Sequence, residues 1–360
     1  MTPATYAEVN LAAVKHNLAR VREYAPNSKI MAVIKANAYG HGLLQIAKAL
    51  EGVDGIAVAR VDEAVRIRKA KVECQIVVLE GFVCKQELDD LIQYNLGCVV
   101  HSPGQIDILE SYSEQGVASV WLKLDSGMSR LGFVPDKFAL AYQRLVKCSH
   151  VKQPISLMTH FSSADELESE VTRQQIKQFN DFVKTLPGEK SIANSAGIMA
   201  WEDSITDWVR PGLMLYGVSP FSNRSAKELA LIPVMSLYSR LISVKTIKAG
   251  EKVGYAGTWV NKAETHIGVV AIGYGDGYPR TAKTGTPVLV NGKRVPLVGR
   301  VSMDMITVDL GYQSDSKPGD RVTLWGAGLP VEEVAEYADT IPYTLLCGVT
   351  QRVEIKSIGR

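Results

Sequence analysis

Short apolar runs alternate with longer amphipathic stretches from residue 29 to about residue 217. Between the runs, apolar residues recur every three or four positions, as on the buried stripe of a helix. Runs without alternation are typical of strands that are buried on both faces of a parallel sheet. Eight runs occur, at residues 29–35, 55–59, 75–80, 97–101, 119–125, 154–160, 191–195 and 208–212. Eight strand–helix units over about 200 residues predict a closed α/β barrel, with an open doubly wound sheet as the alternative.

The pattern changes after about residue 230, where short alternating segments are broken by turn residues. It predicts a mostly β C-terminal domain, so we expect a barrel over residues 1–230 and a β-rich domain over residues 231–360. An Asn-Gly pair at 291–292 lies between strand formers and predicts a hairpin. One helix is expected near residues 331–339, and residues 1–10 could add a strand to the second domain.

Composition narrows the class of protein. The chain has 360 residues with 40 Lys plus Arg against 38 Asp plus Glu, and no basic tract, so we expect a globular protein with no nucleic-acid partner. No apolar run approaches the roughly 20 residues that cross a bilayer, and the N-terminus lacks a signal-peptide pattern. We therefore expect no membrane partner and a cytoplasmic location. Five cysteines without a C-x-x-C pair favour neither a disulfide framework nor a metal site.

Basic and polar residues follow several of the predicted strands. Lys35 ends the first run, and a lysine at the carboxyl end of a barrel strand suits Schiff-base chemistry, although a lone strand-end lysine commonly reaches into solvent. Later strand ends contribute Arg130, His160, Ser195 and Arg210, each with a simple structural explanation when taken alone. Their convergence on one rim predicts a catalytic site for an anionic ligand.

Small residues follow the last two predicted strands, at 195–197 and at 212–213. They would leave backbone N–H groups open near helix starts, which is a recurrent phosphate site in barrels. Plain turn glycines are the alternative. In the second region, loop residues such as Tyr255, Tyr274 and Met303 stand between glycines and prolines. Nothing in that region by itself assigns them to catalysis.

Six segments share a resemblance to one family: VIKANAYGHG, LKLDSGMSRLGF, VRPGLMLYG, VGYAGTW, GYGDGYPR and GRVSMDM. In this order, over residues 6–353, they resemble the alanine racemases. The resemblance implies a barrel followed by a β domain, pyridoxal 5'-phosphate as cofactor, and L- and D-alanine as substrates. It also implies a head-to-tail homodimer with shared active sites. Such an enzyme supplies D-alanine for peptidoglycan or degrades it.

The resemblance also implies roles for individual residues. Lys35 would carry the cofactor as an internal aldimine and serve as one base, and Tyr255 would be the opposite base, contributed by the other subunit. Arg210 would face the pyridine nitrogen, and His160 would link ring stacking to a polar network. The phosphate would be held by Tyr39, Ser195, Gly212, Leu213 and Tyr343.

Further roles concern the substrate. Arg130 would lie near the cofactor's phenolic oxygen and the substrate carboxylate, and Lys123 matches a lysine that is often carbamylated. Met303 and Asp304 would meet the substrate from the second chain, and Tyr274 would narrow the entrance.

Racemisation removes the α-proton from one face of the substrate and returns a proton to the other, so two bases must flank a planar intermediate. Lys35 and Tyr255 suit these roles. An arginine only donates, so Arg210 would leave the pyridine nitrogen unprotonated and limit transamination.

Four other readings stay open at this point. A racemase of broader specificity would share all these residues. A decarboxylase of this fold places an acid at the pyridine nitrogen, against which the arginine argues. A non-catalytic pyridoxal phosphate carrier resembles the barrel half alone, and an unrelated phosphate-sugar barrel enzyme would carry no aldimine.

Overall fold

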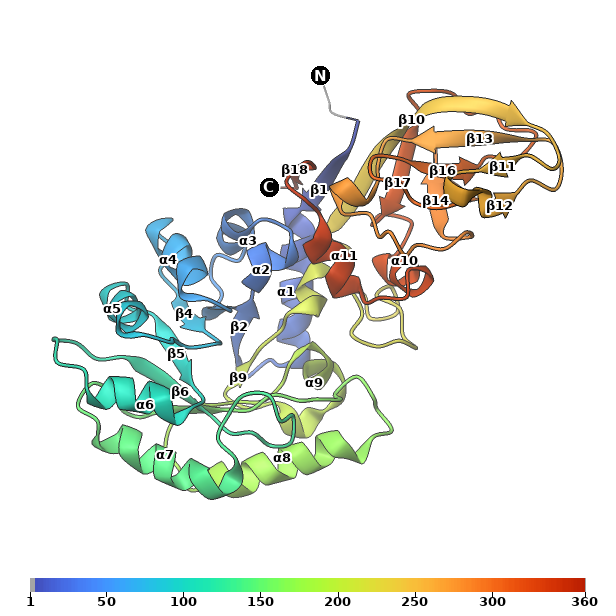
Figure 1. Ribbon diagram of the computed structural model, residues 1–360. Helices are drawn as coiled ribbons and strands as arrows, with labels where there is room; N and C mark the ends of the chain where they lie inside the picture. Colours follow the sequence, from blue (N-terminus) through green and yellow to red (C-terminus); the bar gives the residue numbers. More distant parts are fainter. Residues whose placement is uncertain (1–3, 360) are drawn as a thin grey trace.

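The structure is a computed structural model that describes residues 4–359. A closed barrel of eight parallel strands forms its first part (Figure 1). The last barrel strand pairs with the first, Lys29 opposite Trp208, so the predicted barrel is confirmed over the open sheet. The strands are β2 (Lys29–Val33), β3 (Gly55–Val58), β4 (Gln75–Val78), β5 (Gly97–Val100), β6 (Ser119–Lys123), β7 (Ser156–Met158), β8 (Lys190–Ser191) and β9 (Trp208–Val209).

Helices connect these strands and pack on the outside of the barrel (Figure 1). On α7, the buried residues Phe138, Ala141 and Leu145 recur at steps of three and four, as the sequence pattern predicts. The helices of this part are α1 (Leu11–Tyr24), α2 (Lys35–Tyr39), α3 (Leu43–Ala49), α4 (Val61–Lys69), α5 (Lys85–Gln93), α6 (Pro103–Glu110), α7 (Pro135–Lys147), α8 (Glu170–Val183) and α9 (Ser195–Ala200).

The barrel strands end earlier than the apolar runs suggest. β2 stops at Val33, so Lys35 lies in the following turn and not in the strand. β8 and β9 contain only two residues each. The runs 191–195 and 208–212 therefore contribute mostly loops, which is where a barrel places its functional groups.

The second part is an antiparallel sheet with one parallel pair, in the order β15-β14-β17-β10-β1-β18, and β13 and β16 extend it from β10. The N-terminal β1 runs antiparallel to β10 and parallel to β18. The strands are β1 (Tyr6–Asn10), β10 (Met235–Ile247), β13 (Thr265–Val270), β14 (Pro287–Val290), β15 (Lys293–Pro296), β16 (Ile306–Asp309), β17 (Arg321–Trp325) and β18 (Glu354–Ile358), with β11 (Lys252–Val253) and β12 (Trp259–Val260) as a separate ribbon.

Local features of this part follow the sequence closely. Asn291 and Gly292, both with positive φ, form the turn between β14 and β15, so the predicted hairpin is confirmed. The expected helix is α10 (Val331–Tyr337). A second helix, α11 (Pro342–Gly348), was not predicted, because its buried residues Leu345 and Leu346 are adjacent and show no spacing of three or four positions.

Helix α11 connects the two parts of the molecule at the barrel mouth. A Cβ on Gly40, just after α2, would lie 2.1 Å from the carbonyl oxygen of Leu346, so the two backbones touch. This contact brings Tyr343 of α11 over Tyr39, with ring centroids 5.7 Å apart. Among the helices of residues 4–359, none is long and apolar enough to span a bilayer.

Candidate active site

A cavity of about 710 Å³ opens at the carboxyl ends of the barrel strands. Its walls come from residues that follow successive strands, from β2 to β9, so the barrel closure itself assembles the site. Predicted site residues that line this cavity are Lys35, Tyr39, Lys123, Arg130, His160, Ser195, Arg210, Gly212, Leu213 and Tyr343.

Lys35 starts a left-handed helical turn. The residues Ala36 to Tyr39 all have φ between 52° and 55°. Each such non-glycine residue costs about 1–2 kcal/mol, so the surrounding structure must hold the turn. The buried Glu63 does so from α4, because its Oε1 accepts the Asn37 N–H at 3.2 Å and its Oε2 accepts the Ala59 N–H at 3.1 Å.

His41 closes the same turn from the other end. Its Nδ1 lies 3.0 Å from the carbonyl oxygen of Ala38 and 2.8 Å from that of Tyr39, so Nδ1 carries the proton and donates. Burial lowers the pKa of His41 to about 4, which keeps the ring neutral. Neither Glu63 nor His41 was predicted from the sequence. His41 stands in the ANAYGHG motif, but its role depends on contacts that no local pattern reports.

Ser195 and Gly212 shape the small-residue end of the cavity. The Ser195 Oγ accepts the N–H groups of Gly212 at 3.0 Å and Met214 at 3.3 Å. The expectation that the Gly212 N–H stays open was therefore wrong, because the neighbouring hydroxyl already uses it. A Cβ on Gly212 would lie 2.6 Å from the Tyr39 Oη, so only glycine leaves room for this phenol. The same end gains two phenol donors, since burial raises the pKa of Tyr39 well above its usual value and raises the pKa of Tyr343 to about 12.

Arg210 lies on the floor of the cavity. Its Nη1 donates to the Ser191 Oγ at 2.6 Å and its Nη2 to the Thr159 carbonyl oxygen at 2.6 Å. Burial lowers the pKa of Arg210 to about 10, so the guanidinium keeps its charge at neutral pH. His160 lies 3.4 Å from Nη2 through its Nδ1, and burial together with nearby cations holds the pKa of His160 well below its usual value. The neutral imidazole therefore accepts at Nδ1.

Lys123 and Arg130 complete the basic wall. Burial, followed by the charges of Arg210 and Arg130, lowers the pKa of Lys123 to about 8. Arg130 stands on a loop that Asp125 orders, since Asp125 Oδ1 accepts the N–H groups of Gly127 and Ser129 at 3.0 Å each. With Lys35, four basic side chains face the cavity against the acids Glu80 and Asp165, which suits an anionic ligand.

The predicted residues of the second domain lie elsewhere. Within residues 4–359, the cavity lining includes none of Tyr255, Tyr274, Met303 and Asp304. Tyr255 belongs to the short helical turn η3 (Tyr255–Gly257) and is 67% exposed. Tyr274 and Met303 are 41% and 53% exposed. A single chain thus gathers the predicted cofactor residues and leaves the predicted second base on its surface. In the described residues, no group of three or more His, Cys, Asp or Glu side chains could hold a metal ion.

Comparisons with known proteins identify two family domains in the chain. Residues 9–220 match the family described as alanine racemase, N-terminal domain, and residues 234–357 match alanine racemase, C-terminal domain. The alanine racemase of Shewanella sediminis is 52% identical over 355 residues, covering 99% of each chain, and that of Aeromonas hydrophila is 54% identical over 350 residues, covering 97% of this chain and 98% of that one.

Solved structures give the same result. The biosynthetic alanine racemase of Pseudomonas aeruginosa matches with a TM-score of 0.96 and 42% identity, covering 99% of this chain and all of that chain. The alanine racemase of Acinetobacter baumannii matches with a TM-score of 0.93 and 37% identity, covering 99% and 100% of the two chains. Since both domains match, the carrier that consists of the barrel half alone is excluded. The chain belongs to the alanine racemase family, and its reaction is the racemisation of alanine.

Proposed function

We propose that Lys35 of one subunit and Tyr255 of a second copy of the chain exchange the α-proton of alanine on opposite faces of the substrate. The observation that carries this proposal is the single cavity in which Lys35 lies with Arg130, His160 and Arg210 at the ends of successive barrel strands. Tyr255 is 67% exposed and does not line the cavity of its own chain within residues 4–359, so the site needs a second chain to supply this phenol.

The cavity fits pyridoxal 5'-phosphate. Lys35 offers an amine for the aldehyde, and the buried charge of Arg210 would face the ring nitrogen. Tyr39, Ser195 and the space beside Gly212, with Leu213 and Tyr343, form a small cradle for the phosphate. When bound, this cofactor withdraws electrons and makes the α-proton of an amino acid more acidic.

Protein groups then determine where the proton goes. The Lys35 amine would hold or take the proton on one face, and the Tyr255 phenol would do so on the other. Arg130 would bind the substrate carboxylate, and Arg210, which only donates, would keep the ring nitrogen unprotonated. Met303 and Asp304 of the second copy would meet the substrate, and Tyr274 of that copy would narrow the entrance.

Lys123 adds a modification to this proposal. Its pKa of about 8 leaves a fraction of neutral amine near neutral pH. Such an amine adds to carbon dioxide and releases a proton, and the resulting carbamate anion would face the cation of Arg130. We therefore include a carbamylated Lys123 in the proposed site.

The proposed assembly is a head-to-tail homodimer in which residues 1–230 form the barrel domain and residues 231–360 the β-rich domain that reaches the other subunit. Alanine is the expected substrate because Tyr343 narrows the cavity. Each extra methylene is worth only about 1–3 kcal/mol of discrimination, so slow turnover of serine is expected as well. The product would supply D-alanine for peptidoglycan, or the enzyme would degrade it, in the cytoplasm.

Replacing Tyr255 with phenylalanine tests the two-base assignment. Loss of one acid–base group lowers a rate by about 10²–10⁴-fold. We expect Tyr255→Phe to lose this much alanine racemisation, measured as decay of optical rotation from pure L- and from pure D-alanine. Tyr312→Phe is the control, because Tyr312 is also exposed on the second domain but only stacks on His266. Decay at the parent rate from both enantiomers in Tyr255→Phe would end the assignment.

A further inference from the structure

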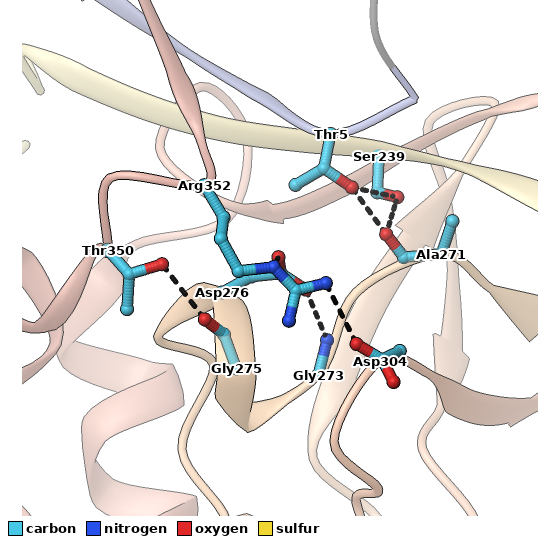
Figure 2. Close-up of polar contacts among 9 residues, drawn as sticks. All are labelled: Thr5, Ser239, Ala271, Gly273, Gly275, Asp276, Asp304, Thr350 and Arg352. Atoms are coloured by element: carbon cyan, nitrogen blue, oxygen red, sulfur yellow. Dashed lines mark hydrogen bonds and ion pairs between the residues drawn. The ribbon is translucent and has the colours of Figure 1, made fainter.

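Arg352 joins two loops of the second domain with one guanidinium group. Its Nε lies 3.2 Å from the Asp276 Oδ1, and its Nη2 donates to the Asp304 Oδ1 at 2.8 Å (Figure 2). Asp276 ends the turn η4 (Tyr274–Asp276), and Asp304 follows Met303 in the loop before β16. Arg352 itself precedes β18. Three segments that are distant in the sequence are therefore tied at one point.

The η4 turn is also held by its own backbone and by Thr350. The side chain of Asp276 is only 8% exposed, and its Oδ2 accepts the Gly273 N–H at 3.0 Å. The Thr350 Oγ1 donates to the Gly275 carbonyl oxygen at 2.9 Å, and the Thr350 N–H donates to the Asp276 carbonyl oxygen at 3.1 Å. The segment that carries Arg352 thus binds the turn at several atoms (Figure 2).

The two loops bond directly to each other. The Tyr274 N–H donates to the Ser302 carbonyl oxygen at 3.0 Å, and the Gly275 N–H donates to that of Met303 at 2.8 Å. A Cβ on Gly273 would lie 2.3 Å from the Met303 carbonyl oxygen, and one on Gly275 would lie 2.3 Å from the Arg352 Nη1. Gly273 is required for this close packing, because a Cβ there would collide with backbone atoms.

The side chains above this fixed backbone are apolar and exposed. Tyr274 is 41% exposed and Met303 is 53% exposed, so their own chain does not bury them. A backbone held by this many polar contacts presents such side chains in one geometry, which is what a selective binding surface needs. The ion pair with Arg352 also offsets the charge of Asp304, which would otherwise repel a substrate carboxylate.

We propose that Arg352 is a positioning residue for substrate selection, which holds Tyr274 and Met303 as one rigid unit at the entrance of the other subunit's cavity. This inference rests on the proposed function, because that function places these side chains beside the substrate of the second copy. The ion pair with Arg352 fixes Asp304, and through the backbone of the same loop it orients Met303.

Kinetics of Arg352 variants test the proposal. For Arg352→Gln we expect KM for alanine to rise about tenfold with kcat within about twofold, because ground-state binding is lost and the proton transfers are kept. The ratio of kcat/KM for serine to that for alanine should rise several-fold. Arg352→Lys should recover part of both effects, since one ammonium can pair with one carboxylate but cannot bridge two.

The control is Arg294→Gln, which removes the ion pair between Arg294 on β15 and Glu333 on α10 and should leave KM and selectivity unchanged. Cofactor absorbance and melting temperature should stay at parent values in the Arg352 variants. If Arg352→Gln does not fold, Arg352→Lys carries the test. A folded Arg352 variant with the KM and the selectivity of the parent would overturn the proposal. If Tyr255→Phe has lost alanine racemisation in the same assays, the proposed function still stands.

Mixed dimers, purified through two different tags, test whether Arg352 acts on the other subunit. In one dimer, a single chain carries both Lys35→Ala and Arg352→Gln, so the only working cavity faces the altered loops and KM should be raised. In the other, the two changes lie on different chains, so the working cavity faces intact loops and KM should match the parent. Equal KM values in the two dimers would refute action across the interface.

Discussion

The two halves of the proposed site differ in burial: the barrel mouth buries its residues, whereas the loops of the second domain expose theirs. At the mouth, Arg210 is 5% exposed and bonds to β8 and to the loop after β7, so one chain completes the arrangement. On the second domain, Tyr255 is 67% exposed and contributes nothing to a cavity in its own chain within residues 4–359. Burial marks the half of the site that we propose holds the cofactor, whereas unexplained exposure marks the half that serves another subunit in the proposed dimer.

Complementation between two inactive variants gives the largest expected effect. We expect Lys35→Ala and Tyr255→Ala homodimers each to lose nearly all alanine racemisation, by about 10²-fold or more. After random exchange of subunits, about half of the dimers are mixed, and each mixed dimer has one cavity with both bases. The mixture should therefore regain about a quarter of the parent activity, measured as decay of optical rotation.

This recovery depends on the two residues acting from different chains. If both bases came from the same chain, each mixed dimer would contain no complete site and the mixture would stay inactive. Mixing Lys35→Ala with a second preparation of Lys35→Ala is the control for the exchange procedure. If tags prove that subunits have exchanged and the mixture of the two variants still shows no racemisation, the two bases do not act from different chains.

Acid stability is the next effect in size, and it concerns the turn that positions Lys35. The pKa of His41 is about 4 in the folded chain against an ordinary value of 6.5. Between these values the unfolded chain binds more protons, so the free energy of unfolding falls as pH decreases from 6.5 towards 4. This contribution is on the order of 3 kcal/mol. In His41→Asn, which keeps a donor near the Ala38 and Tyr39 carbonyls, it should be absent.

Urea unfolding at a series of pH values measures this difference. Carboxylates contribute to acid unfolding equally in both proteins, so the comparison isolates His41. His266→Asn is the matched control on the second domain, because His266 is half-buried on β13 and bonds only to Thr246. Parallel pH profiles for the parent and His41→Asn would show that this ring does not contribute.

Replacing one glycine by alanine in each region is expected to have the smallest effects. Gly212→Ala places a methyl group 2.6 Å from the Tyr39 Oη, so we expect pyridoxal phosphate to bind about tenfold more weakly, measured by fluorescence titration. Gly292→Ala, in the hairpin at φ 80°, meets no atom within 4 Å. It should cost about 1 kcal/mol of stability and leave binding unchanged. Equal cofactor affinity in the two variants would contradict the cradle at Gly212.

Sequence patterns were most informative for strands and for residues at strand ends. Each of the eight apolar runs overlaps a barrel strand, and every barrel residue predicted by resemblance lines one cavity. Residues that hold the cavity or the loops of the second domain were missed, among them Glu63, Ser191 and Arg352. A carboxylate on a helix or an arginine before a strand has no local signature, because its role depends on atoms of other segments.

By itself, the sequence determined the elements and the family, since hydrophobic periodicity depends only on which side of each element is buried, and the motifs are local. The tertiary structure decided the rest. It placed Lys35 in a left-handed turn and paired the Gly212 N–H with the Ser195 hydroxyl. It also linked Asp276 to Asp304 through Arg352. These outcomes depend on burial and on contacts between segments that are separated in the sequence, such as those of Asp276 and Arg352, and only the folded chain brings such segments together.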